Sequence, residues 1–259
     1  MADFIDDDLH GSRFDHVNLG GSQLRAVDLS DAAFRGVDLS RAVLRGVDLV
    51  DASIDGDIDG LTINGVEVEP LVNAELDRRF PLRPKMRPTE PKGFLEAWDI
   101  LEELWDGTVF HARGLSPEML HESVDGEWSF IETLRHLTFA TDSWLKRAIL
   151  GDPSPWDALG LPWDEMTDTP GVPRDRVVQP SLDEVLELRR DRRSSVRHFF
   201  EGLSDISLAG NTVPVEGPGW PPARSYPVRQ CLLIILNEEW EHRLFAERDL
   251  TALEARGLA

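Results

Sequence analysis

The chain has 259 residues, of which 41% are hydrophobic and 29% are charged, and this composition is typical of a globular protein with one or two domains. Its formal net charge of −21 disfavours direct binding to nucleic acid or to an anionic membrane surface. No apolar run approaches the roughly 20 residues of a membrane-spanning helix, and the acidic start MADFIDDDLH lacks the pattern of a signal peptide.

Two further compositional features bear on the setting of the protein. The single cysteine, Cys231, rules out an intrachain disulfide, so we expect a reducing, cytoplasmic environment. Because Cys231 opens the apolar run CLLIIL, we expect it to act as a small buried hydrophobic residue. Arginine greatly outnumbers lysine, and this bias is typical of bacteria with GC-rich genomes.

A five-residue repeat runs through the N-terminal segment. A bulky apolar residue occupies every fifth position from Phe4 to Ile54, and a small or β-branched residue stands two positions before most of them. Asp7 breaks the second rule, so we expect the first repeats to form an imperfect cap. A period of five fits neither the 3.6-residue helix nor the two-residue strand, and it indicates a repeat architecture.

The segments FDHVNL, RAVDL and RGVDL, the last present twice, resemble the pentapeptide-repeat family, whose consensus is roughly A-(D/N)-L-x-x. The resemblance implies a short right-handed quadrilateral β-helix with four repeats per coil and both recurring residues pointing inward. Residues 20 apart, such as Phe14, Phe34 and Ile54, would then stack. Each coil of such a solenoid buries its interior on the next, so we expect this short one to need cover at one end.

The repeat decays after Ile54. The stretch LTINGVEVEPL alternates like a strand and contains an Asn-Gly turn. It is followed by FPLRPKMRPTEPKG, whose four prolines are typical of a linker or wrapping segment. We therefore assign residues 1–69 to the repeat domain, 70–93 to a linker or wrap, and 94–259 to a second domain.

The second domain has a helical period. Four apolar residues share one face of its first helix: Phe94, Trp98, Leu101 and Trp105. The next two helices each open with the Ser-x-x-Glu spacing of a capping box, at Ser129–Glu132 and Ser181–Glu184. Pro227 starts a last helix that runs to about Ala255. Four such helices predict a bundle, so the fold class is a multidomain β + α protein. The long connections near 151–180 and 204–226 are typical of functional or disordered loops.

Three polar residues on the inner helix faces are candidate metal ligands. Glu238 and His242 are four residues apart in NEEWEHRLFAERDL, so both project from one face of the last helix. His136 lies on the second helix, where its small neighbours Ala140 and Ser143 leave room for a ligand to approach. A buried carboxylate is costly unless it is paired or metal-bound. Imidazole and carboxylate together suit Zn, Ni, Fe or Mn.

A simpler interpretation stays open at this point. Glu238 and His242 can form an exposed ion pair, which contributes only a few tenths of a kcal/mol. Glu239 and Glu241 can belong to the same solvated face, and His136 can be a satisfied interior histidine. Trp128, just before the second helix, is expected to be a hydrophobic anchor or to line the mouth of a pocket. We expect Arg135 and Asp142 to be surface or salt-bridge residues.

The segment GEWSFIETLRHLTFATDSWLKRAIL, together with NEEWEHRLFAERDL, resembles the DinB-like superfamily over residues of about 94–255. The resemblance implies a four-helix bundle related to mycothiol- and bacillithiol-dependent enzymes. The usual metal triad of that superfamily is one His on the second helix and an H-x-x-x-H pair on the last. His136 and His242 match two of these positions, and Glu238 stands where His is common, which changes the charge and metal preference of the site.

Two functions are therefore expected. In the first, the resemblance implies a divalent metal held by His136, Glu238 and His242 and a small-molecule thiol such as mycothiol. The protein would then be a transferase or isomerase of unknown substrate, and the sequence singles out no catalytic base. In the second, the acidic repeat segment, with a net charge of −10 over residues 1–69, makes the protein a non-catalytic interaction partner. It would act as a DNA mimic or as an assembly module that packs on the bundle or on a second subunit in a homodimer.

Overall fold

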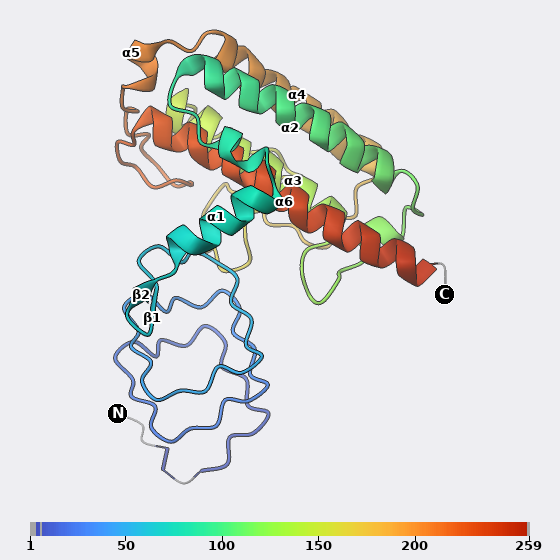
Figure 1. The fold of residues 1–259 in the computed structure, drawn as a ribbon. Coiled ribbons are helices and arrows are strands. Elements are labelled where there is room, and N and C mark those ends of the chain that lie inside the picture. Colours follow the sequence, from blue (N-terminus) through green and yellow to red (C-terminus); the bar gives the residue numbers. More distant parts are fainter. Residues whose placement is uncertain (1–3, 6, 258–259) are drawn as a thin grey trace. The chain divides into compact units, whose positions relative to one another are not determined.

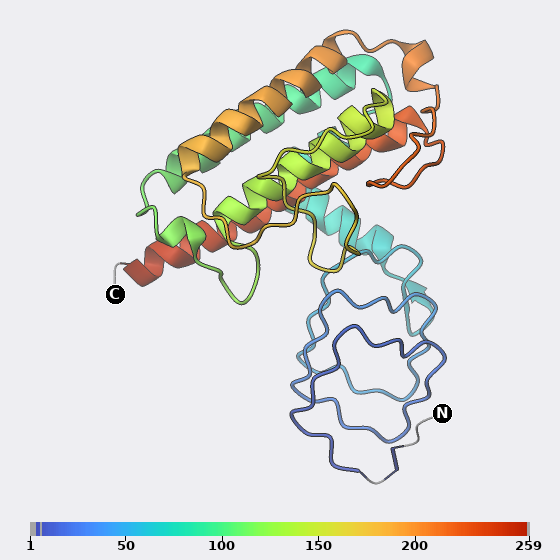
Figure 2. The same cartoon turned by 180° about the vertical axis from the view of Figure 1, so that it is seen from behind.

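The computed structural model describes residues 4–5 and 7–257. The chain divides into two units, Met1–Asp51 and Ala52–Ala259. In Figures 1 and 2 the colours follow the sequence, from blue at the N-terminus to red at the C-terminus. This division falls before residue 69, because the residues of the predicted Asn-Gly turn group with the helices that follow them. The predicted bounds 1–69, 70–93 and 94–259 stay a prediction.

The five-residue period of the sequence is present in the backbone. One residue in every five has a positive φ angle, and the series is Gly11, His16, Gly21, Ala26, Asp31, Gly36, Arg41, Gly46, Asp51 and Gly56. Just before four of these positions, the side chain of an Asp or Asn accepts a hydrogen bond from the backbone N–H two residues later, at Asp8, Asn18, Asp28 and Asp38. These Asx turns explain why the repeat prefers Asp or Asn.

The side chains of the repeat differ from the prediction. Phe14, Phe34 and Ile54 keep 57%, 60% and 63% of their surface exposed, so the expectation that they are buried in a stacked interior is wrong. Among the described residues, the repeats contain no strand, and the only sheet is a short hairpin further along the chain. Phe34 is as exposed as Phe14 and Ile54 although repeats precede and follow it, so the low burial is not confined to the ends of the repeat segment.

The hairpin consists of strand β1 (Thr62–Ile63) and strand β2 (Val66–Glu67), which pair in antiparallel register with Thr62 opposite Glu67. Asn64 and Gly65 between them have φ angles of 50° and 80°. Two successive positive φ angles define the type I′ turn for which Asn-Gly is preferred. The predicted turn is confirmed.

The proline-rich segment is ordered and attached to the helices. Helix α1 (Glu69–Arg79) precedes it, and it includes the 3₁₀ turn η1 (Arg83–Met86). Phe80 meets the edge of the Trp240 ring at a centroid distance of 6.3 Å, and the Met86 side chain is buried in the helical core. Two apolar anchors therefore hold this segment against the helices.

Four long helices lie side by side, as Figures 1 and 2 show, and their bounds are α2 (Pro91–Ala112), α3 (Phe130–Thr141) with its π-helical continuation η3 (Asp142–Ile149), α4 (Leu182–Glu201) and α6 (Val228–Gly257). The short elements are η2 (Met119–His121) and α5 (Asp205–Leu208). The predicted helical bundle is confirmed. Both capping boxes are formed, and in the first the Ser129 N–H donates to Glu132 over 2.9 Å. The predicted stripe on α2 is buried.

Two buried arginines hold the long loops. Arg135 is fully buried and donates to the backbone carbonyls of Leu159, Asp175 and Val178, all in the loop between η3 and α4. Its assignment to the surface or to a salt bridge is therefore wrong. Arg147, equally buried, donates to carbonyls on both long loops: Pro153, Val215, Gly217 and Pro221. Each guanidinium offers several donors in a fixed geometry, which suits it to pinning several carbonyls at once.

Asp142 is a buried salt-bridge residue. Its carboxylate oxygens accept hydrogen bonds from Arg192 of α4 over 2.9 and 3.1 Å. The pair ties the start of η3 to α4, which helps to fix the α3–η3 helix in the bundle. Within the described part of the chain, none of the helices combines the length and the apolar character needed to cross a membrane.

Cys231 provides a test of the core around α6. Burial raises the pKa of its thiol from 9.0 to about 11, so we expect slow alkylation by iodoacetamide at pH 8 in the native protein and fast alkylation in urea. The raised pKa contributes stability below pH 9 that is lost as the pH rises toward 11, because the unfolded chain releases its proton first. This loss should be absent in Cys231→Ala. Fast alkylation of the folded protein at pH 8 would contradict the buried position.

Candidate metal centre

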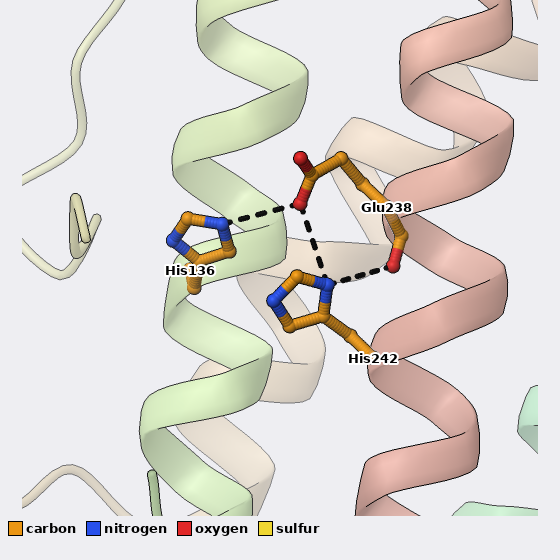
Figure 3. Close-up of side chains that lie close together, drawn as sticks. All are labelled: His136, Glu238 and His242. Atoms are coloured by element: carbon orange, nitrogen blue, oxygen red, sulfur yellow. Dashed lines mark hydrogen bonds and ion pairs between the residues drawn. The ribbon is translucent and has the colours of Figure 1, made fainter. Parts of the chain in front are cut away.

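The three predicted ligands meet between two adjacent helices. His136 comes from the middle of α3, and Glu238 and His242 come from successive turns of α6, so that all three side chains converge (Figure 3). One potential ligand atom from each residue lies within 4.8 Å of the other two. The four-residue spacing places Glu238 and His242 on the same face, as the helical period requires.

The Glu238 carboxylate joins the two imidazoles. Its Oε2 atom lies 3.3 Å from His136 Nε2 and 3.3 Å from His242 Nδ1, and both contacts are drawn as dashed lines in Figure 3. Glu238 therefore points into the space between the helices and not toward an arginine. The three-residue site requires the Glu238 side chain to point in this direction.

A loop carbonyl orients His136. The Nδ1 atom of His136 lies 3.0 Å from the Leu161 carbonyl oxygen. A carbonyl only accepts hydrogen bonds, so Nδ1 carries a proton, and Nε2 faces the Glu238 carboxylate. The Leu161 N–H in turn donates to the Arg135 carbonyl, which fixes the loop to α3. A backbone carbonyl that holds the far nitrogen is a common support for a metal-binding histidine.

His242 has a similar support from its own helix. Its Nδ1 lies 2.9 Å from the Glu238 backbone carbonyl one turn earlier. The proton is again assigned to Nδ1, and Nε2 carries the lone pair. Burial and the neighbouring His136 lower the pKa of His242 to about 4, so the ring is neutral at pH 7.

The electrostatics of the site favour a cation. Burial opposes the ionisation of Glu238, but its hydrogen bond with His136 and the electrostatic attraction of the two histidines hold its pKa below the ordinary value. The contact between the Glu238 carboxylate and His136 Nε2, 3.3 Å apart, is favourable when a proton or a metal ion lies between the two atoms. Deprotonated carboxylate and neutral imidazole are the forms in which both groups bind metals.

Trp128 covers the site. Its ring lies 4.5 Å from the His136 ring and stacks on His242 at 5.9 Å, measured between centroids. Its indole N–H donates to Asp164 over 3.2 Å, which fixes the ring in place. The exposed fractions of the side chains rise from 7% at His136 to 19% at His242 and 27% at Glu238. The site is therefore open to solvent on the Glu238 side.

The neighbouring carboxylate does not belong to a solvated face. Glu239 is buried, and its carboxylate accepts a hydrogen bond from Arg189 of α4 over 2.8 Å. The interpretation of Glu239 as a surface residue beside Glu238 is therefore wrong. This buried pair fixes α6 against α4 one residue away from the candidate ligand.

Sequence reasoning missed two parts of the site. The Leu161 carbonyl could not be found, because every residue type supplies a carbonyl and the loop has no periodic pattern. Arg189 left a signal, since it lies one turn after Val185 on the apolar stripe of α4, where an arginine needs a buried partner.

Comparison with known protein families gives two matches. The model of the DinB superfamily matches residues 100–246, more than half of the chain. Pentapeptide repeats match in eight copies over residues 2–41 and 22–56. No curated protein and no solved structure matches the chain significantly. Both predicted resemblances are confirmed: pentapeptide repeats precede the helical domain, and the chain belongs to the DinB superfamily.

Proposed function

We propose that His136, Glu238 and His242 bind a divalent metal ion and that the helical domain is a metal-dependent enzyme that acts with a small-molecule thiol. The observation that carries this proposal is the convergence of the three side chains, each of which offers one ligand atom within 4.8 Å of the other two. The orientation of His136 by Leu161 supports it. The DinB superfamily is typically metal-binding, which supports it independently.

The donor set restricts the metal. Two imidazole nitrogens and one carboxylate oxygen suit Zn, Fe, Mn or Ni and leave coordination positions open for water or substrate. A carboxylate in place of a third imidazole lowers the net charge of the loaded site by one unit. It also favours metals with a higher affinity for oxygen, such as Mn and Fe, relative to a site with three histidines.

The thiol must come from outside the chain. Cys231 is buried and its pKa is raised to about 11, so it is neither accessible nor ionised at pH 7. A bound metal ion lowers the pKa of a thiol that coordinates it. The roles of the chain's own residues are to keep His242 neutral, to keep Glu238 ionised and to shield the site through Trp128. The resemblance to thiol-dependent enzymes favours mycothiol and a transferase or isomerase reaction.

Metal content tests the first part of the proposal. We expect about one metal ion per chain, by elemental analysis, in protein purified without a metal-affinity tag. His136→Ala and His242→Ala should lose this metal, because each removes a ligand. His111→Ala is the matched control, since His111 also lies on a long helix and contacts two carboxylates, Glu247 and Glu254, at 3.3 Å. The proposal would be contradicted if the wild-type protein contained no metal and the two variants had the same thermal stability as the wild type.

Glu238 provides a sharper test. Glu238→Gln keeps the shape of the side chain but removes its charge, and we expect its metal affinity to fall by at least about 100-fold, as losing a ligand should exceed the loss of a supporting contact. Glu238→His should retain binding and shift the preference from manganese toward zinc. Competition titrations with a chromogenic chelator measure both affinities. Equal affinities in wild type and Glu238→Gln would show that the carboxylate is not a ligand.

Cobalt spectroscopy tests the thiol. In cobalt-loaded protein, addition of mycothiol should produce a thiolate-to-cobalt charge-transfer band, because the metal site has open positions for a sulfur ligand. The band should be absent in His136→Ala and present in His111→Ala. If mycothiol gives no band while cysteine does, the thiol part of the proposal holds and the choice of mycothiol is wrong. If no thiol gives a band, the thiol part is wrong.

A further inference from the structure

A cavity adjoins the candidate metal centre. Its volume is about 260 Å³, and His136 and Glu238 form the part of its lining that belongs to the triad. The small side chains of Ala140 and Ser143 line another part, as their position near His136 predicts. Among the described residues that line this cavity, Glu238 is the only acidic one, and none is a lysine or arginine.

Three tryptophans form much of the wall. Trp144 belongs to η3, Trp163 to the loop between η3 and α4, and Trp220 to the loop before α6. The rings of Trp163 and Trp220 meet edge to face at a centroid distance of 4.8 Å, although 57 residues separate them in sequence. Aromatic walls of this kind bind flat apolar groups.

Buried arginines fix the position of this wall. Arg135 holds the loop that carries Trp163 through the Leu159 carbonyl, and Arg147 holds the loop that carries Trp220 through the Gly217 carbonyl. Breaking such bonds would leave a buried guanidinium with unsatisfied donors, which is strongly unfavourable. The aromatic wall is therefore formed before any ligand binds, as is usual for small-molecule sites.

The size of the cavity restricts its occupant. A dry cavity of about 150 Å³ is enough for benzene, and the 260 Å³ of this pocket, which is open to solvent, has room for one aromatic ring. The absence of a basic residue in the lining disfavours an anionic group in this space. We propose that the cavity binds a neutral, single-ring aromatic group of a ligand whose polar head reaches the triad. Only the chemistry of the head, a metal-coordinating thiol, rests on the proposed function.

Fluorine NMR tests the cavity by itself. We expect 4-fluorotoluene, a neutral ring without a metal-binding group, to bind metal-free and zinc-loaded protein with the same affinity. Ile234→Trp adds bulk to the α6 side of the lining and should weaken binding at least about ten-fold, because it occupies the space of the ring. Trp163→Leu removes part of the wall and should weaken it by about five-fold. Phe110→Leu, an aromatic residue that is 82% exposed on α2, is the control and should have no effect.

Circular dichroism and urea unfolding establish which variants fold, and either wall variant is sufficient for the test. Failure of wild-type protein to bind 4-fluorotoluene, or equal binding by the folded wall variants and Phe110→Leu, would overturn the cavity proposal. A second ligand, 4-fluorobenzyl thiol, separates the two proposals. It should bind zinc-loaded protein at least about ten-fold more tightly than 4-fluorotoluene does. No such gain, with 4-fluorotoluene still bound, contradicts the thiol-binding metal centre and leaves the aromatic cavity in place.

Discussion

The hydrogen bond from His136 to the Leu161 carbonyl connects the helical bundle with its longest loop. It fixes which nitrogen of His136 faces α6, and therefore the chemistry that the site can offer. The Glu238 carboxylate completes the arrangement from the opposite helix, where its Oε2 atom lies 3.3 Å from a nitrogen of each imidazole. Burial keeps His242 neutral, which is the form in which an imidazole binds a metal ion.

The loops take part in the site through the buried arginines. Arg135 lies next to His136 in the sequence, and its side chain and backbone carbonyl both bind the loop that carries Leu161 and Trp163. The same helix therefore supplies a candidate ligand and the anchor for the group that orients it. Arg147 anchors the loop that carries Trp220 through the carbonyls of Val215 and Gly217. The two buried arginines explain why both long loops are ordered over the bundle. The π-helical turn at η3 lies beside this region, as such turns often do at functional sites.

Regular features could be predicted from the sequence. The helices of the bundle follow from apolar periodicity and from the capping boxes at Ser129 and Ser181, because both signals are local. The triad could be proposed because helical spacing and the family resemblance both pointed to His136, Glu238 and His242. The roles of Arg135 and Leu161 could not, because loop carbonyls leave no side-chain pattern. The five-residue repeat predicted the backbone turns, which are local, but not the exposure of Phe14 and Phe34, since burial in a solenoid depends on how closely successive coils pack. The interaction role of the repeat segment stays a prediction.

The central claim of this account is that a metal ion lies between the two imidazoles and the carboxylate. Anomalous diffraction from crystals of zinc-loaded protein, recorded above and below the zinc edge, locates such an ion directly. The account predicts a single strong peak about 2.0–2.2 Å from a nitrogen of His136, a nitrogen of His242 and a carboxylate oxygen of Glu238. No peak at this position, with Glu238 hydrogen-bonded directly to a protonated imidazole, would contradict it.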